Sequence, residues 1–70
     1  MNEEENFEAL ELAIQDHHLL KVSELKREDN NALLKRDRWT QAALRPFTEI
    51  AGRLGLNYIV HDATTIVIFL

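Results

Sequence analysis

Residues 57–70, N-Y-I-V-H-D-A-T-T-I-V-I-F-L, decide the fold, and they predict a β-hairpin. The first strand is expected over residues 57–61 and the second over residues 65–70. The second strand carries apolar side chains on both faces, with Ile66, Ile68 and Leu70 on one and Val67 and Phe69 on the other. Because an antiparallel strand usually keeps one face in water, this run predicts that both of its faces are covered.

A second copy of the chain is the expected cover. The 70 residues are predicted to form a single small domain, 1–70, with residues 1–5 as a candidate disordered acidic start. A domain of this size buries only about 60% of the surface that its unfolded chain exposes. The chain has no cysteine, so disulfides cannot stabilise it. Oligomerisation is the remaining way to stabilise so small a domain. We therefore predict a homodimer through the sheet, with its interface at Val67 and Phe69 or, alternatively, at Ile66, Ile68 and Leu70.

A first helix is expected over about residues 4–28. Its apolar stripe follows steps of three and four residues. The stripe consists of Phe7, Leu10, Ile14, His18, Val22 and Leu25. Residues 17–25 could also form a short strand, and the unbroken stripe favours the helix. Asp29-Asn30-Asn31 is expected to end it.

A second helix is expected over about residues 32–54, bent or split at Pro46 because proline removes a helical hydrogen bond. Its apolar face consists of Trp39, Ala43, Phe47, Ile50 and Leu54. The motif R-L-G-L at residues 53–56 is a strong helix end, since glycine adopts the left-handed conformation there. The predicted architecture is therefore α+β in the order ααββ, with both helices packed on the C-terminal hairpin.

Charge is unevenly distributed along the chain, whose net charge is −4. The first candidate for partner binding is an acidic arm, defined by Glu4, Glu8 and Glu11. The second is a basic cluster, defined by Lys35, Arg36 and Arg38, which flanks Trp39. Arginine beside tryptophan occurs in protein interfaces and in nucleic-acid sites, but the apolar spacing places Trp39 in the core.

The sequence contains no pattern typical of an enzyme or of a metal site. His17 and His18 are adjacent and would point about 100° apart on a helix, and His61 lies in the hairpin turn. Ser23 has no motif around it, and Gly52 and Gly55 belong to a helix end. We therefore expect no catalytic residue, no metal and no cofactor.

The start of the chain, M-N-E-E-E-N, is acidic where a signal peptide would be basic. No apolar run approaches the roughly 18–20 residues that span a bilayer. These features predict a cytoplasmic protein that does not bind membranes.

One segment, L-R-P-F-T-E-I-A-G-R-L-G-L-N-Y-I-V at residues 44–60 followed by T-T-I-V-I-F, resembles a unit of the Arg-x-x-x-His domains. The resemblance implies a helix followed by strands and a role in binding single-stranded nucleic acids. The two positions that define that family hold Leu44 and Thr48 here. We therefore interpret the likeness as a shared packing unit and assign no family.

Taken together, these features favour a small non-enzymatic adaptor or inhibitor that binds an unidentified protein as a homodimer. A phage or plasmid-encoded regulator of a host protein would fit this description. The alternative is a nucleic-acid-binding regulator that uses residues 26–45, although the acidic net charge opposes phosphate binding.

Overall fold

The computed structural model describes residues 2–17 and 20–70, which form two helices and four strands. In chain order the elements are α1 (Glu3–Gln15), β1 (Glu24–Glu28), β2 (Asn31–Lys35), α2 (Gln41–Leu54), β3 (Asn57–Val60) and β4 (Thr65–Phe69). The α+β class is as predicted, but the order ααββ is wrong. Along the chain the hairpin β1–β2 comes between the two helices, so the order is αββαββ.

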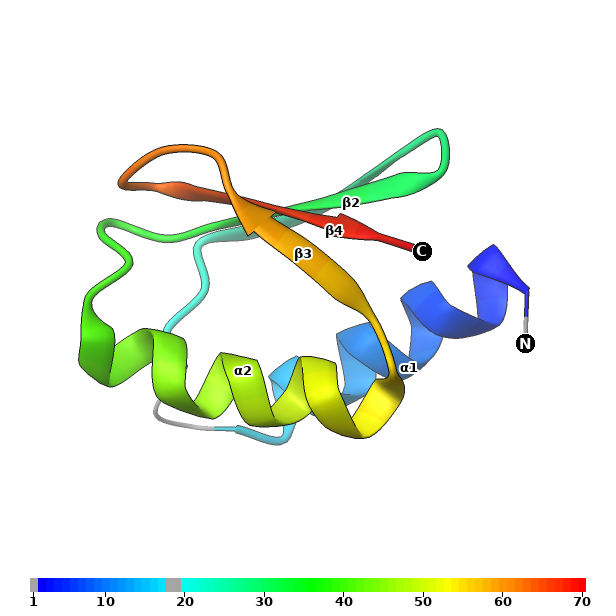
Figure 1. The fold of residues 1–70 in the computed structure, drawn as a ribbon, viewed down its shortest axis with the longest axis horizontal. Helices are drawn as coiled ribbons and strands as arrows, with labels where there is room; N and C mark the ends of the chain where they lie inside the picture. The colour runs from blue at the N-terminus through cyan, green and yellow to red at the C-terminus, as the bar shows by residue number, and fades with distance from the viewer. Residues whose placement is uncertain (1, 18–19) are drawn as a thin grey trace.

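The four strands form one antiparallel sheet in the order β1-β2-β4-β3. β4 lies between β2 and β3, with Ile68 opposite Ala32 on one side and Tyr58 on the other. Both helices lie on the same side of this sheet (Figure 1). The sheet therefore has one face that is covered by helices and one open face.

The core fills the space between the sheet and the two helices. Its largest fully buried side chains are Phe47, Leu10, Leu34, Ile66 and Ile68. The ring of Phe47 packs edge-on against Tyr58, with 4.8 Å between the ring centroids.

The predicted packing of the α2 face is confirmed. Trp39, Ala43 and Phe47 are buried with Leu10 and Ile14 of α1 in a single apolar cluster. Trp39 is therefore a core residue, as its spacing predicted, although it precedes the first turn of α2.

The first helix is shorter than predicted. α1 begins at Glu3, where the side chain of Asn2 caps it by accepting a hydrogen bond from the Glu5 N–H (2.8 Å). In the structure Asn2 is therefore the cap of α1, and Glu3, Glu4 and Glu5 form its first turn. The helix ends at Gln15 and residues 24–28 form β1, so the strand alternative is correct for Glu24 and Leu25.

The prediction of one helix over residues 4–28 is wrong because a short run of apolar residues can fit both the helical period of 3.6 residues and the strand period of two. In β1, Leu25 is half-buried between exposed Glu24 and Lys26, which is the alternation of a strand. The predicted stripe also passes through His18, which lies outside the described residues. Pairing with β2 satisfies the backbone groups of β1 that face β2, and no sequence pattern within β1 itself signals that pairing.

The expected helix break at residues 29–31 is instead a two-residue hairpin turn. Glu28 is paired with Asn31, and Asp29 adopts a left-handed φ of 55° between them. Aspartate tolerates this conformation better than most residues do. Residues 31–35 consequently form β2 rather than the start of the second helix.

The second helix begins at Gln41 rather than near residue 32. Thr40 caps it by accepting a hydrogen bond from the Ala43 N–H (3.2 Å). The helix is not split at Pro46, because it continues through this residue to Leu54. It ends as predicted, with Gly55 in the left-handed conformation (φ 69°) and Leu56 buried behind it.

The C-terminal hairpin is confirmed, and its turn spans residues 61–64 between β3 and β4. The carboxylate of Asp62 organises this turn by accepting hydrogen bonds from the N–H groups of Thr64 and Thr65, both at 2.8 Å. Within the described residues, no helix has both the length and the apolar character needed to cross a membrane.

Candidate protein-binding surface

The open face of the sheet carries a row of apolar side chains. The strand register places Leu33 of β2, Val67 of β4 and Ile59 of β3 directly beside one another. Phe69 lies on the same face, two residues along β4 from Val67. Ile59 is 50% exposed and Phe69 is 43% exposed, so this apolar row faces solvent in the single chain.

The structure separates the two predicted sets of dimer residues in β4. Ile66 and Ile68 are fully buried by the helices of their own chain, so they are not accessible to a second copy. Val67 and Phe69 point to the open face, and Leu70, which follows β4, is half-buried. The apolar surface of β4 that faces solvent is therefore the one formed by Val67 and Phe69.

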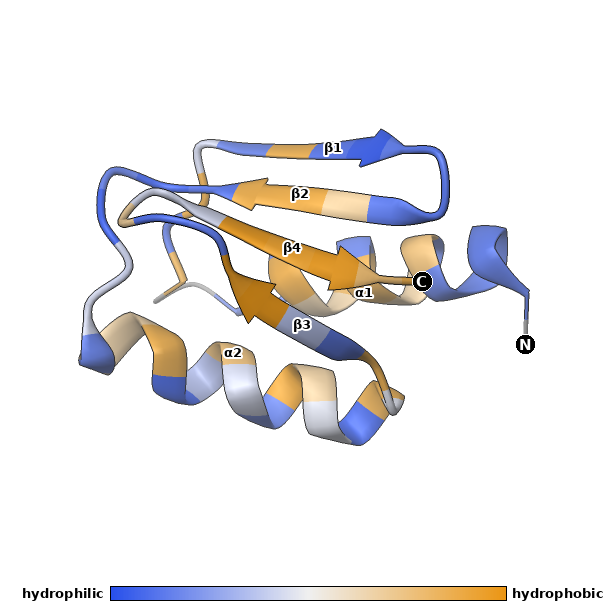
Figure 2. Ribbon diagram, turned by 45° about the horizontal axis from the view of Figure 1, so that its top comes forward, coloured by the Kyte–Doolittle hydropathy of each residue, from blue (hydrophilic) through white to orange (hydrophobic). Residues whose placement is uncertain are grey.

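The two edges of the sheet differ in charge. β1, at one edge, has the sequence E-L-K-R-E and carries four charged residues. β3, at the other edge, has the sequence N-Y-I-V and carries none. Figure 2 shows the same contrast, since β1 is mostly hydrophilic whereas the end of β3 is hydrophobic. Charged side chains on an edge strand oppose pairing with another strand, so β1 is protected and β3 is not.

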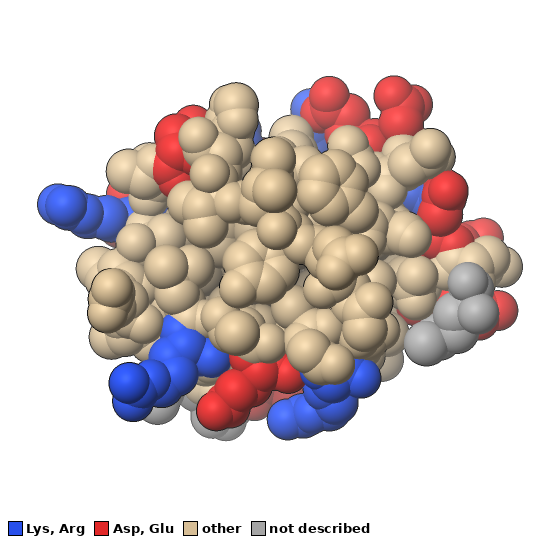
Figure 3. Space-filling view, viewed as in Figure 1, with Lys and Arg blue, Asp and Glu red and all other residues tan. Residues whose placement is uncertain are grey.

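An uncharged surface extends from β3 towards α2. In the view of Figure 3, the centre of this face shows no lysine, arginine, aspartate or glutamate, and the charged side chains lie around its rim. Ile59 and Val60 of β3 are 50% and 49% exposed. Below them, Tyr58 is fixed by a hydrogen bond between its hydroxyl and that of Thr48 (3.1 Å). This uncharged surface therefore combines the exposed apolar side chains of Ile59 and Val60 with the hydrogen-bonded hydroxyls of Tyr58 and Thr48.

The acidic arm lies on α1. Glu4, Glu8 and Glu11 are all exposed, and their spacing of four and three residues places them on one side of the helix. No hydrogen bond or ion pair of the described residues involves their carboxylates. The structure thus brings the three predicted residues together on a solvent-facing surface.

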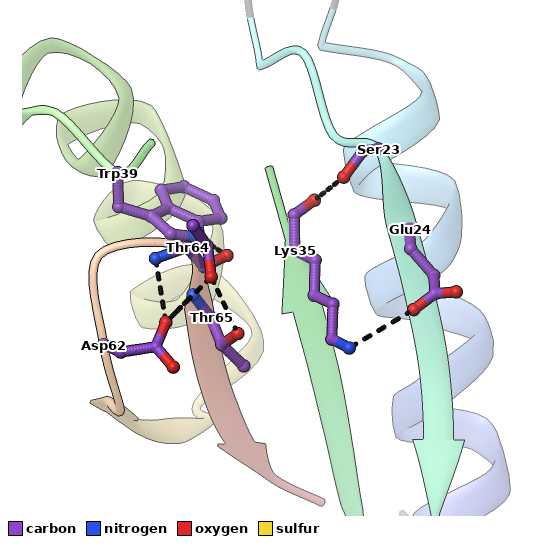
Figure 4. Close-up of polar contacts among 7 residues, drawn as sticks. All are labelled: Ser23, Glu24, Lys35, Trp39, Asp62, Thr64 and Thr65. Atoms are coloured by element: carbon purple, nitrogen blue, oxygen red, sulfur yellow. Dashed lines mark hydrogen bonds and ion pairs between the residues drawn. The ribbon is translucent and has the colours of Figure 1, made fainter. Parts of the chain in front are cut away.

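The basic cluster is less available than the sequence suggested. Lys35 forms an ion pair with Glu24 (3.7 Å; Figure 4). The guanidinium of Arg36 donates hydrogen bonds to the carbonyl groups of Lys21 (3.3 Å) and Arg38, and it lies over the Trp39 ring, 5.6 Å from its centroid. Arg36 therefore holds the connection before α2 in place, and Arg38 is the most exposed member of the cluster.

The Asp62 turn is tied to the same connection. Trp39 donates a hydrogen bond from its indole Nε1 to the carbonyl of Thr64 (3.1 Å), and the Thr64 hydroxyl is 2.9 Å from the Asp62 carboxylate (Figure 4). These hydrogen bonds, chiefly the one from the Thr64 N–H, lower the pKa of Asp62 below its ordinary value of 3.8. We interpret this turn as structural, because the backbone N–H groups of Thr64 and Thr65 already occupy the Asp62 carboxylate.

The described histidines do not form a metal site. Residues 2–17 and 20–70 contain no group of three or more histidine, aspartate and glutamate side chains that could hold an ion. His17 follows α1, His61 lies in the turn after β3, and His18 lies outside the described residues. The hydroxyl of Ser23 donates a hydrogen bond to the carbonyl of Lys35 (3.0 Å; Figure 4), which is a structural contact.

The apolar row was missed from the sequence because one of its strands was missed. Leu33 was assigned to a helix, so nothing placed it beside Val67. In the structure Ala32 and Leu34 are buried and Leu33 is half-buried on the other face, but the run A-L-L at residues 32–34 is apolar throughout, so its sequence shows no strand alternation. Asp29-Asn30, a plausible tight turn, preceded it.

Comparison of the chain with known protein families, with curated proteins and with solved structures found no match. The function is therefore inferred from the surface of the molecule itself.

Proposed function

We propose that this protein is a non-enzymatic adaptor or inhibitor that acts as a homodimer and binds another protein on the open face of its sheet. The observation that supports this proposal is the solvent-facing apolar row of Leu33, Val67 and Ile59, with Phe69 beside it. Protein interfaces typically have an apolar centre with a polar rim. Here Glu24, Lys26 and Glu28 of β1 provide that rim.

The charged rim gives the surface its selectivity. Lys26 stands at the end of the apolar row opposite Leu33, and Glu28 stands at the end of the neighbouring row. A partner would need an apolar strip flanked by groups of the opposite charges, since complementary charges suppress wrong partners. The acidic arm on α1 remains a predicted second contact, as does the basic cluster at Lys35, Arg36 and Arg38.

Affinity capture with a matched pair of variants tests this proposal. Val67→Asp places a carboxylate in the centre of the apolar row, and Leu12→Asp makes the same change at a 61% exposed position of α1. Wild type and Leu12→Asp should retain a protein partner from nuclease-treated lysate, whereas Val67→Asp should lose it. Melting curves of the three proteins at dilute concentration establish that each variant is folded.

Two outcomes would replace the proposal. If Val67→Asp retains the partner but Glu4→Lys, Glu8→Lys and Glu11→Lys together abolish capture, the acidic arm is the contact surface. If the protein captures only nucleic acid, and nuclease removes it, the alternative of a nucleic-acid-binding regulator using residues 26–45 is correct. A labelled oligonucleotide should then bind at low salt and dissociate steeply as salt rises.

A further inference from the structure

β3 has unpaired backbone groups along the free edge of the sheet. The hydrogen bond from the His61 N–H to the Thr65 carbonyl (2.9 Å) fixes the alternation of the β3–β4 ladder. Hydrogen-bonded and non-hydrogen-bonded pairs alternate in an antiparallel ladder, so Asn57 and Ile59 direct their backbone groups to β4. The N–H and C=O groups of Tyr58 and Val60 consequently face outward, and no described strand lies beyond them.

An occupant of this edge must match its chemistry. It has to supply an extended, uncharged segment with free N–H and C=O groups, because β3 offers no charge that would attract a charged strand. Among the described residues, one such segment lies at a free edge of the sheet, and it is β3 itself. The other edge strand, β1, is excluded as an occupant by its four charged residues.

We propose that β3 pairs with β3 of a second copy, antiparallel and about a two-fold axis that passes through Ile59. This inference rests on the homodimer of the proposed function and specifies where that dimer forms. Tyr58 of each copy would exchange two backbone hydrogen bonds with Val60 of the other.

The side chains of β3 select this register over its neighbours. With the axis at Ile59, the two Ile59 side chains meet on the open face, and Tyr58 meets Val60 of the second copy on the helix side. Aromatic and β-branched residues are favourable cross-strand pairs. Asn57 then lies opposite His61 of the second copy, which pairs polar with polar.

The two neighbouring registers pair the side chains poorly. An axis at Tyr58 places Ile59 opposite Asn57 of the second copy, and an axis at Val60 places Ile59 opposite His61. Moving the two-fold axis by one residue therefore separates the Ile59 side chains of the two copies. The register centred on Ile59 is the one that keeps every side chain of the strand beside a similar one.

The same register joins the two apolar rows. Leu33, Val67 and Ile59 of one copy would continue into Ile59, Val67 and Leu33 of the other, because each row lies perpendicular to the strands. The dimer would thus present one continuous apolar row across both sheets. This doubles the surface that the proposed function assigns to the partner.

Disulfide trapping tests the register directly, since the chain has no cysteine of its own. Ile59→Cys should form a disulfide dimer under mild oxidation at least ten times faster than Leu12→Cys, which controls for random collision. Side chains of non-hydrogen-bonded antiparallel pairs are close enough for this bond. A mixture of Asn57→Cys and His61→Cys chains should likewise form the mixed disulfide. Faster trapping of Val60→Cys than of Ile59→Cys would overturn the register.

Sedimentation equilibrium separates this inference from the proposed function. Pairing of residues 57–61 of the two copies buries less than the roughly 1,600 Å² of a standard interface, so concentrations should extend into the high micromolar range. Val60→Lys, which places a charge on the free edge, should raise the dimer dissociation constant at least tenfold. A wild-type dimer that is insensitive to Val60→Lys and is not trapped by Ile59→Cys would overturn this inference alone. A wild-type monomer at every concentration would overturn both it and the homodimer.

Discussion

Two aspartates set the geometry of the two hairpin turns, and each does so by a different property. Asp62 acts through its charge, since its carboxylate accepts the N–H groups of Thr64 and Thr65. Asp29 acts through its backbone, which tolerates a φ of 55°. A substitution at either position therefore tests a local physical cause rather than the packing of the core.

The Asp62 carboxylate should make stability depend on pH in the acidic range. Because hydrogen bonds lower its pKa in the folded state, its contribution is fully present above the ordinary value of 3.8 and is lost as pH falls through the lowered pKa. We expect Asp62→Ala to lower the melting temperature at pH 7 and the difference from wild type to shrink below about pH 3.8. A constant difference across that range would assign the effect to something other than the charge.

At Asp29, the positive φ predicts unequal effects for two substitutions. Asp29→Val should destabilise the protein by about 1–2 kcal/mol, because a β-branched residue adopts positive φ poorly. Asp29→Gly removes the steric cost and should leave stability within about 1 kcal/mol of wild type. Urea denaturation measures both, and equal losses for the two variants would contradict the turn conformation.

At the scale of elements, the sequence predicted well where a boundary had its own chemical signal. R-L-G-L marked the end of α2, and the two-faced run at residues 65–70 marked β4. It failed for β1 and β2, because their identity comes from pairing with each other and with β4 rather than from local propensity. Of the candidate surface, Ile59, Val67 and Phe69 were visible in the sequence, whereas Leu33 depended on the missed strand.

The two glycines at the end of α2 should respond oppositely to alanine. Gly52 lies inside the helix with open space where a Cβ would be, so Gly52→Ala should stabilise by about 0.5–1 kcal/mol. Gly55 adopts a φ of 69° as the helix cap, so Gly55→Ala should destabilise by about 1 kcal/mol. Thermal melts decide this, and a stabilising Gly55→Ala would show that the cap is not left-handed.

The packing of α2 on the sheet should depend strongly on Phe47. This side chain is fully buried between Trp39 and Tyr58, and replacing a buried phenylalanine with alanine costs about 3–5 kcal/mol. That loss should unfold most of so small a domain at 37 °C. Circular dichroism melts measure it, with Gly52→Ala as the helix control; an unchanged melt would refute the facing of α2.

At the scale of the whole molecule, the sheet has one edge that repels pairing and one edge that permits it. A molecule with a single permissive edge can form a closed two-fold pair but cannot extend further, whereas two permissive edges allow open-ended growth. In the proposed homodimer, the charges of β1 would therefore limit the assembly to two copies in addition to opposing the pairing of that edge with other strands.

Removing three of the four charges of β1 should convert the proposed dimer into larger assemblies. In the variant Lys26→Thr, Arg27→Thr, Glu28→Thr, both edges would accept a strand, so we expect species larger than a dimer that grow with concentration. Light scattering after size-exclusion chromatography measures this, and Leu12→Thr controls for a surface change away from the edges. A variant that stays at the wild-type size would show that charge does not protect β1.

The central position of β4 also has a kinetic consequence. Both hairpins close short loops. Two residues connect β1 to β2, and residues 61–64 connect β3 to β4. Hairpins with such loops form within about 1–10 μs. Among the four described strands, the pairing of β2 with β4 is the one that joins the two hairpins, and it must close a loop that contains all of α2. Because non-local contacts of this kind slow folding, the joining of two preformed hairpins around α2 should be the rate-limiting step.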